Sequence, residues 1–384
     1  MKLGILTQPL RNNYGGLMQA WALQKVLTEA GNEVIIINRE YRRLKDMNLI
    51  RRTASIVKRE LSIALGIEKR QPQLSEIQEF YIRKYIIPFI ENRYEGISPT
   101  LYTEKSFRKY IECANFDGLV VGSDQVWRPR YSPAICNYFL DFLPQISEVK
   151  RIAYAASFGV DNWEFSPIET KKSTELAKKF DFIGVRESSG IGLCRKYLDV
   201  SAKYVADPTL LLDRNYYDAL IDNPSVSLRP SNGELFCYVL DSAKELKDVI
   251  NACSSSLGYT PYYCNAVRKI TNSDDLKYLD ECTFPPVEQW LKSFRDAEMV
   301  ITDSFHGTVF SIIYNKPFWV VVNNSRGATR FHSLLDKFGL THRIVDSSKK
   351  INWLDPIDWQ FVNTIRKEFT DFSKALLFSA LNEK

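Results

Sequence analysis

The chain opens with short, mainly apolar runs separated by an amphipathic stretch. Leu3–Thr7 and Val34–Asn38 have strand length, and between them apolar residues recur at helical spacing up to Gly31. A glycine at that point is typical of a helix end. We therefore predict a Rossmann-like β-α-β unit. Its loop is not GxGxxG and no acidic residue closes the second strand, so a dinucleotide site is not expected.

The alternation resumes after residues 39–115, which we interpret as a helix-rich, basic and aromatic insertion. Four further strands are predicted, and each is followed by a polar cluster. Because open parallel sheets bind ligands at the carboxyl ends of their strands, these clusters are candidate sites. The four strands are 116–121, 151–156, 181–185 and 203–206.

Residues 222–233, rich in Pro, Ser and Asn, form the clearest linker. A second alternating block follows, with strands predicted at 235–240, 260–264, 299–302, 318–322 and 343–345. The pattern predicts an α/β fold in which two Rossmann-like domains, 1–222 and 234–350, face a cleft. A C-terminal helix within 357–384 is expected to pack back on the first domain.

The chain is organised around the turn Asp303-Ser304-Phe305-His306-Gly307-Thr308 between a buried strand and a short apolar helix. Asp303 or Ser304 can cap this helix, and the N–H groups of its first turn offer an anion site. The helix dipole disfavours a cationic His306, one of three histidines, and favours a neutral, base-competent imidazole. The alternative is an ordinary β-α-β connection with an incidental histidine.

Length and composition agree with this organisation. A chain of 384 residues with 45% hydrophobic and 25% charged residues is typical of a globular protein of two domains. Seven cysteines without a CxxC pair favour reduced thiols and argue against a zinc or disulfide framework, and we expect no metal site. We expect a cytoplasmic protein, because neither a signal peptide nor an apolar run of about 18 residues is seen.

The net charge of +5 comes from one segment. Arg39–Arg59 holds eight Lys or Arg against two acidic residues, a local +6, which leaves −1 for the remainder. A solvated helical face is the plainest interpretation. An anionic acceptor or peripheral contact with an anionic membrane surface is the alternative. Nucleic acid is not expected, because aromatic residues are not interleaved with the basic ones.

A cleft between the domains would collect polar residues from both. Asn13, Tyr14, Asp124 and Gln125 are candidates from the first domain, and the last two could bind sugar hydroxyls. Arg186 is either a bidentate clamp for carboxylate or phosphate or a salt-bridged residue at the sheet's rim. The second domain offers Ser304, His306 and Thr308 with Arg326 and Arg330, two arginines of a polar loop.

Several motifs in order resemble the polysaccharide pyruvyl transferase family. They are Asn13-Tyr14-Gly15-Gly16 with the following Gln19–Gln24, then Val121–Trp127, Val185-Arg186-Glu187, Ala206–Thr209 and Thr302–Thr308. Each is weak alone, and together they are specific over about residues 1–340.

The resemblance implies a fold similar to the GT-B glycosyltransferases and transfer of pyruvate from phosphoenolpyruvate onto sugar hydroxyls of a cell-surface glycan or its lipid-linked precursor. It assigns catalysis to His306 and Arg186. It places Arg326 near the basic residue that meets the donor. From the residues themselves we expect the donor at Ser304, Gly307, Thr308, Arg326 and Arg330, and the acceptor at Asn13, Tyr14, Asp124, Gln125 and the insertion 39–115. No cofactor is expected beyond phosphoenolpyruvate as co-substrate.

One departure matters. Many members carry a basic residue in the histidine turn, whereas this chain has Ser304-Phe305-His306, so the donor's charge must be met elsewhere, by Arg326 or Arg330. Two alternatives stay open: a GT-B glycosyltransferase that uses a nucleotide sugar, and a non-catalytic binding protein of the same fold.

Overall fold

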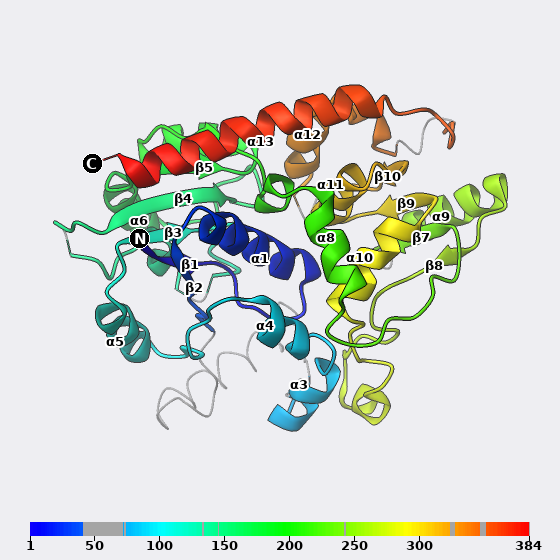
Figure 1. The fold of residues 1–384 in the computed structure, drawn as a ribbon, viewed down its shortest axis with the longest axis horizontal. Helices are drawn as coiled ribbons and strands as arrows, with labels where there is room; N and C mark the ends of the chain where they lie inside the picture. The colour runs from blue at the N-terminus through cyan, green and yellow to red at the C-terminus, as the bar shows by residue number, and fades with distance from the viewer. Residues whose placement is uncertain are drawn as a thin grey trace.

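The chain folds around two parallel β-sheets that lie side by side and are each covered by helices (Figure 1). The computed structural model describes residues 1–40, 72, 74–132, 134–144, 146–241, 243–322, 327–345 and 351–383. The two parallel sheets confirm the predicted α/β class. Residues 41–59, most of the basic segment, lie outside the described part of the chain.

The first sheet has the order β2-β1-β3-β4-β5-β6 within the described residues, and every neighbouring pair is parallel. The connections from β1 and β3 lead to opposite edges, so a crevice opens at the carboxyl ends of these two strands. The strands are β1 (Lys2–Leu6), β2 (Glu33–Ile36), β3 (Gly118–Val121), β4 (Lys150–Ala156), β5 (Phe182–Val185) and β6 (Lys203–Tyr204).

The second sheet has the order β10-β9-β7-β8 in the described residues, with β7 and β9 at its own switch point. Its strands are β7 (Leu235–Tyr238), β8 (Pro261–Tyr262), β9 (Met299–Thr302) and β10 (Phe318–Val320). The strand predicted at 343–345 is wrong: Thr341–Arg343 is a 3₁₀ turn, and only Ile344 bridges to Val320.

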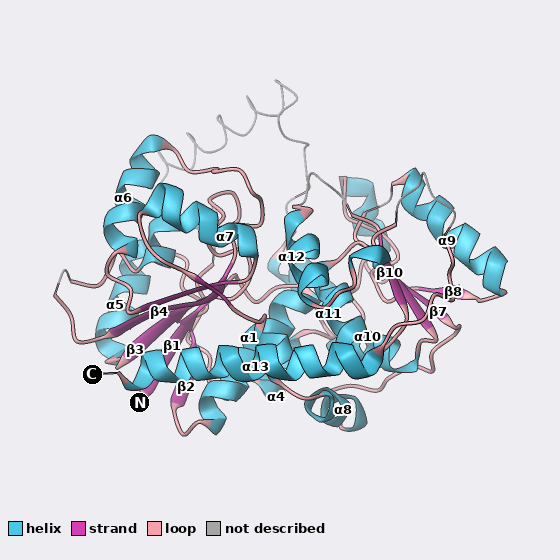
Figure 2. Ribbon diagram, turned by 90° about the horizontal axis from the view of Figure 1, so that it is seen from above, coloured by secondary structure: helices cyan, strands magenta, loops and turns pink. Residues whose placement is uncertain are grey.

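Helices cover both faces of both sheets (Figure 2). In the first domain α5, α6 and α7 lie on one face, and α1 and α13 on the other. In the second, alternate residues of β7 divide between α9 on one side and α10 and α11 on the other. The helices are α1 (Tyr14–Glu29), α3 (Glu76–Ile82), α4 (Ile87–Arg93), α5 (Glu104–Ala114), α6 (Pro167–Ala177), α7 (Ser188–Leu193), α8 (Arg214–Asp222), α9 (Lys244–Leu257), α10 (Val287–Asp296), α11 (Phe305–Ile313), α12 (Thr329–Lys337) and α13 (Trp359–Asn382).

The long C-terminal helix α13 crosses from the second domain to the first (Figures 1 and 2). The buried hydroxyl of Ser373 accepts a hydrogen bond from the N–H of Ala206 at 2.9 Å, just past β6. Thr370 donates to the carbonyl of Leu210 at 2.8 Å. The helix thereby fastens the end of the chain to the strand-end region of the first sheet.

The two domains also share apolar packing. One continuous core includes β1 residues and β7 and β9 residues. At its centre Tyr14, the first residue of α1, stacks on Trp290 of α10 with ring centroids 5.5 Å apart. Its hydroxyl donates to the carbonyl of Pro285 at 2.8 Å. The start of α1 is therefore held directly against the second domain.

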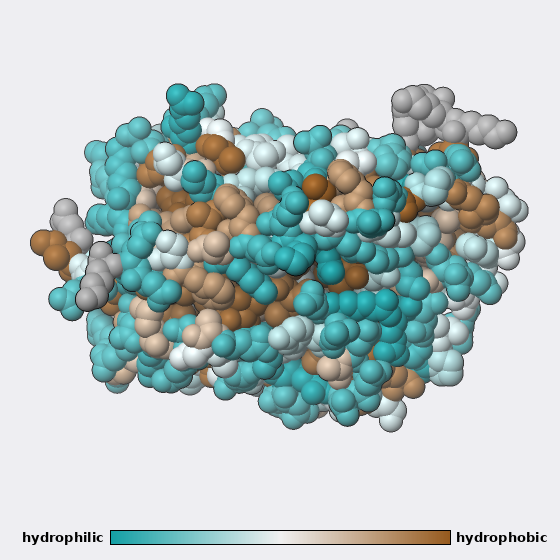
Figure 3. Space-filling model, turned by 45° about the horizontal axis from the view of Figure 1, so that its top comes forward, coloured by the Kyte–Doolittle hydropathy of each residue, from teal (hydrophilic) through white to brown (hydrophobic). Residues whose placement is uncertain are grey.

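The surface seen in Figure 3 is mixed, with apolar side chains scattered among hydrophilic ones. Phe361 and Phe372 of α13 are about half exposed. Among the described residues, no helix has both the length and the apolar character needed to cross a membrane.

Candidate active site

The switch points of the two sheets face one cavity of about 530 Å³. Its walls come from the residues that follow β1 and β3 in the first domain and β7 and β9 in the second. Such positions are where open α/β sheets and domain interfaces bind small ligands. The cavity brings together seven of the residues expected from the sequence: Asn13, Tyr14, Asp124, Gln125, Ser304, His306 and Arg330.

His306 lies in the first turn of α11, which begins directly after β9. Ser304 is the N-cap, and its hydroxyl accepts a long hydrogen bond of 3.4 Å from the N–H of Gly307. Asp303 does not cap the helix. Its carboxylate accepts from the N–H groups of Leu240 and Asp241 and so ties the end of β7 to this turn. The turn is thus a fixed element of the cavity wall.

A buried carboxylate stands beside the His306 ring. Nε2 of His306 lies 3.5 Å from Oδ2 of Asp207, which follows β6. The other oxygen of Asp207 accepts from the N–H and the hydroxyl of Thr209 at 3.0 and 2.7 Å. Burial alone raises the pKa of Asp207, but His306, Arg186 and these hydrogen bonds together hold that pKa far below its usual range. Asp207 is therefore a permanent anion next to the imidazole.

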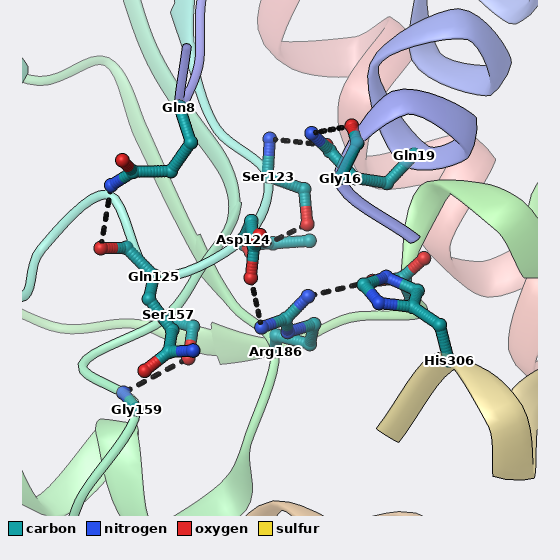
Figure 4. A network of polar contacts seen from close by, with 12 residues as sticks. Gln8, Gly16, Gln19, Ser123, Asp124, Gln125, Ser157, Gly159, Arg186 and His306 are labelled. Atoms are coloured by element: carbon teal, nitrogen blue, oxygen red, sulfur yellow. Dashed lines mark hydrogen bonds and ion pairs between the residues drawn. The ribbon is translucent and has the colours of Figure 1, made fainter. Parts of the chain in front are cut away.

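Arg186 is fully buried between two carboxylates (Figure 4). One terminal nitrogen donates to Asp207 and the other to Asp124, each at 3.0 Å. The guanidinium also lies over the ring of Phe305, 4.6 Å from its centroid. Arg186 is not among the residues that line the cavity. The geometry favours the salt-bridged alternative over the clamp, because both terminal nitrogens already donate to buried carboxylates.

The acceptor candidates of the first domain form the opposite wall. The second oxygen of Asp124 is 3.4 Å from Nδ2 of Asn13, a weak contact. The carbonyl of Gln125 accepts from the side chain of Gln8 at 2.9 Å (Figure 4). Tyr14 contributes its ring to the wall, but its hydroxyl is bonded to Pro285. Asn13, Asp124 and Gln125 are the groups with polar atoms to offer a ligand.

Arg330 enters the cavity wall from α12. Its guanidinium lies over Phe305, 5.9 Å from the ring centroid, on the same aromatic side chain that Arg186 contacts. Burial and the neighbouring Arg186 lower the pKa of Arg330 to about 10. The side chain is therefore still cationic at neutral pH.

A family model described as polysaccharide pyruvyl transferase matches residues 13–325. The chain belongs to the polysaccharide pyruvyl transferase family. The matched range begins at Asn13 and includes Asp124, Arg186, Asp207 and His306, the residues that surround the first-domain side of the cavity and the histidine turn. It ends before Arg330. Membership of this family implies a transferase with a polysaccharide acceptor.

Several solved structures resemble the chain over nearly their whole length. At these identities and TM-scores they carry no argument about its substrate, and no curated protein matches the sequence. UDP-GlcNAc 2-epimerase from Neisseria meningitidis bound to UDP-GlcNAc is 10% identical with a TM-score of 0.45, over 98% of this chain and 94% of that one. UDP-N-acetylglucosamine 2-epimerase from Rickettsia bellii is 11% identical with a TM-score of 0.41, over 100% of this chain and 97% of that one. Spinosyn forosaminyltransferase is 12% identical with a TM-score of 0.40, over 96% of this chain and 94% of that one.

Three of the residues expected to bind the donor in this pyruvyl transferase family member either do not line the cavity or lie outside the described part. Gly307 and Thr308 do not line the cavity. Gly307 packs so closely on Thr302 that a Cβ would lie 2.2 Å from its hydroxyl oxygen, and Thr308 donates to the carbonyl of Ser304. Their contacts are thus made within the turn itself. Arg326 is outside the described residues.

Asp207 is the residue that sequence reasoning missed. It sits in the Ala206–Thr209 motif and in one of the polar clusters after strands, and that position was the available signal. No pattern in the sequence pairs it with His306, about 100 residues away, because only the meeting of two domains brings β6 and α11 together. The described residues contain no group of three or more His, Cys, Asp or Glu suited to a metal ion.

Proposed function

We propose that this protein transfers the pyruvyl group of phosphoenolpyruvate to two hydroxyls of one sugar, forming a ketal on a cell-surface polysaccharide or its lipid-linked precursor. The supporting observation is the arrangement of one cavity wall: His306 at a helix N-terminus, a buried carboxylate behind it, and the cation of Arg330 on the same wall. The family supplies the reaction class, and this wall suits a small, doubly anionic donor.

The donor carries a carboxylate and a phosphate, and the second domain offers two kinds of positive potential for them. Arg330 is a half-buried cation, and the first turn of α11 presents the N–H groups of Phe305 and His306, whereas that of Ser304 is donated to Thr302. Arg330 reaches the cavity over Phe305, next to the position where a basic residue was expected. It supplies the charge that Ser304 lacks. Arg326 remains a second candidate for the same role.

The first-domain wall suits the acceptor. Asp124, Gln125 and Asn13 line it and carry carboxylate and amide groups, which hydrogen-bond sugar hydroxyls. Asp124 keeps its charge because Arg186, His306 and Arg330 outweigh the effect of burial and lower its pKa. A carboxylate there can accept from a hydroxyl and orient it toward the donor.

The reaction balances without a further co-reactant. One hydroxyl oxygen bonds to the carbon that bears the phosphate, and one proton adds to the methylene carbon to make the methyl group. The carbon–oxygen bond to phosphate then breaks, and the second hydroxyl oxygen bonds to the same carbon. The proton of this second hydroxyl leaves with inorganic phosphate. His306 acts as the general acid or base in these proton movements, a role worth roughly 10²–10⁴ in rate.

Calorimetry separates this proposal from its alternatives without an acceptor. We expect the wild type to bind phosphoenolpyruvate and not UDP-sugars. Arg330→Gln should weaken phosphoenolpyruvate binding at least tenfold, because it removes a charge-assisted contact worth about 1.5–3 kcal/mol. Arg195→Gln, which changes an exposed arginine of the first domain, is the matched control. Binding of UDP-sugars alone, or of neither ligand, would reject the proposal.

Turnover tests the role of His306. With a panel of saccharide acceptors, phosphate release from phosphoenolpyruvate should fall by at least two decades in His306→Ala, while His332→Ala, an exposed histidine of α12, stays near wild type. Circular dichroism should show an unchanged fold in both variants. Near-wild-type turnover of His306→Ala would remove this residue from the mechanism.

A further inference from the structure

The two ring nitrogens of His306 lie in different surroundings. Nε2 is buried and faces the carboxylate of Asp207 at 3.5 Å, an ion-pair distance rather than a well-aligned hydrogen bond. Nδ1 faces the start of α1: a Cβ built on Gly15 would lie only 2.1 Å from it. His306 and the neighbouring Asn13 and Tyr14 all line the cavity. The ring therefore lies between the buried carboxylate of Asp207 and Gly15 of α1, which has no side chain.

Asp207 is itself fixed on every side. Thr209 donates twice to one oxygen, and Arg186 donates to the oxygen that faces His306. Arg186 is fixed in turn by Asp124 on its other terminal nitrogen. An acceptor held this firmly selects the ring nitrogen that carries the hydrogen, because a carboxylate only accepts. The neutral imidazole therefore keeps its hydrogen on Nε2.

We propose that Asp207 is the positioning residue of His306, which holds Nε2 protonated, and that Nδ1 is the atom that exchanges the proton with substrate. The proton exchange at Nδ1 rests on the proposed function, whereas the protonation of Nε2 does not. Nδ1 takes the hydrogen of an attacking hydroxyl as that oxygen bonds to the donor carbon. The imidazolium gives the same proton up afterwards, so His306 ends each cycle unchanged. Gly15, which has no side chain, is what lets the ring lie against the start of α1.

The protonation of the ring can be measured without any substrate. In protein labelled with ¹⁵N-histidine, the three histidines give few signals, and His306→Gln assigns the one from this ring. For the neutral ring we expect the long-range ¹H–¹⁵N pattern of an imidazole protonated at Nε2. A ring protonated at Nδ1 overturns the proposal even if phosphoenolpyruvate turnover is observed. An Nε2-protonated ring in a protein that does not bind phosphoenolpyruvate would reject the proposed function alone.

Asp207→Asn supplies the kinetic test. Asn can donate to Nε2 as well as accept, so the tautomer preference should be lost or reversed and kcat should fall by 10²–10⁴, with KM for phosphoenolpyruvate little changed. Asp213→Asn, an exposed carboxylate six residues on, is the control. An unchanged tautomer in a folded Asp207→Asn protein would overturn the proposal. If that variant does not fold, the wild-type spectrum still decides.

Discussion

Gly15→Ala probes the contact between the two domains at the centre of the site. The added Cβ would lie 2.1 Å from Nδ1 of His306 and 2.3 Å from Cγ. Ordinary contact needs about 3.5 Å, so ring and helix must separate by roughly 1.4 Å. Overpacking of this kind costs about 1–3 kcal/mol, whereas alanine gains at most about 1 kcal/mol over glycine in a helix. We expect a less stable protein with a displaced imidazole.

A double-mutant cycle isolates the clash from the helix effect. Urea unfolding of wild type, Gly15→Ala, His306→Ala and the double variant should show a coupling of about 1–3 kcal/mol, because the clash disappears when the ring is absent. Gly16→Ala is the matched control: its Cβ would meet Asn13, not His306. It should be additive with His306→Ala within about 0.5 kcal/mol.

Activity gives a second measurement of the same change. A displacement of about 1 Å at a catalytic group costs on the order of 10² in rate, so turnover of Gly15→Ala should fall by that factor. Additive free energies in the Gly15→Ala and His306→Ala cycle would refute the reasoning, since they would mean that the ring does not rest on Gly15.

Three further changes test the contacts that assemble the site. Tyr14→Phe removes the hydrogen bond to Pro285 and should cost about 0.5–1.5 kcal/mol in urea unfolding. Ser373→Ala removes the contact that fastens α13 to the first domain and should cost about 1–3 kcal/mol, because a buried N–H loses its partner. Arg186→Met should cost about 3–5 kcal/mol at pH 7, because it leaves buried carboxylates uncompensated, and distinctly less at pH 4.5.

The pH dependence of the last prediction follows from linkage. The folded pKa of Asp207 and that of Asp124 lie below their usual values, so the stabilisation is complete above the unfolded pKa of about 4 and is lost as the pH falls from there towards the folded values. Without Arg186, burial raises both pKa values, and the folded protein takes up protons as the pH falls. A cost that does not change with pH would contradict this.

Tyr216→Phe and Ser379→Ala, whose hydroxyls are exposed, are the controls for Tyr14→Phe and Ser373→Ala.

The regular elements were predictable because their signals are local. Strand-length apolar runs, helical spacing up to Gly31 and the polar turn around His306 each depend on neighbours along the chain, and the structure places β1, α1, β9 and α11 there. The strand at 343–345 was overpredicted for the same reason, because a local apolar run cannot show how many of its residues pair with a neighbouring strand, and only Ile344 does.

Local patterns also showed which residues could meet at the site, because parallel strands place their polar clusters at one edge of a sheet. Asn13, Asp124, Ser304 and His306 do line one cavity. The sequence alone thus determined the class of fold, the family resemblance and most of the residues around the site.

Only the tertiary structure decided what each charged residue does there. Arg186 could be a ligand clamp or a salt-bridged residue by sequence, and the meeting of β3, β5 and β6 encloses it between two carboxylates. Asp207 lies in a polar cluster after a strand, but no sequence pattern pairs it with His306, which docking of the second domain brings to it. The roles of these residues depend on burial and on partners about 20 to 100 positions away, and such distances are set by packing rather than by any pattern along the chain.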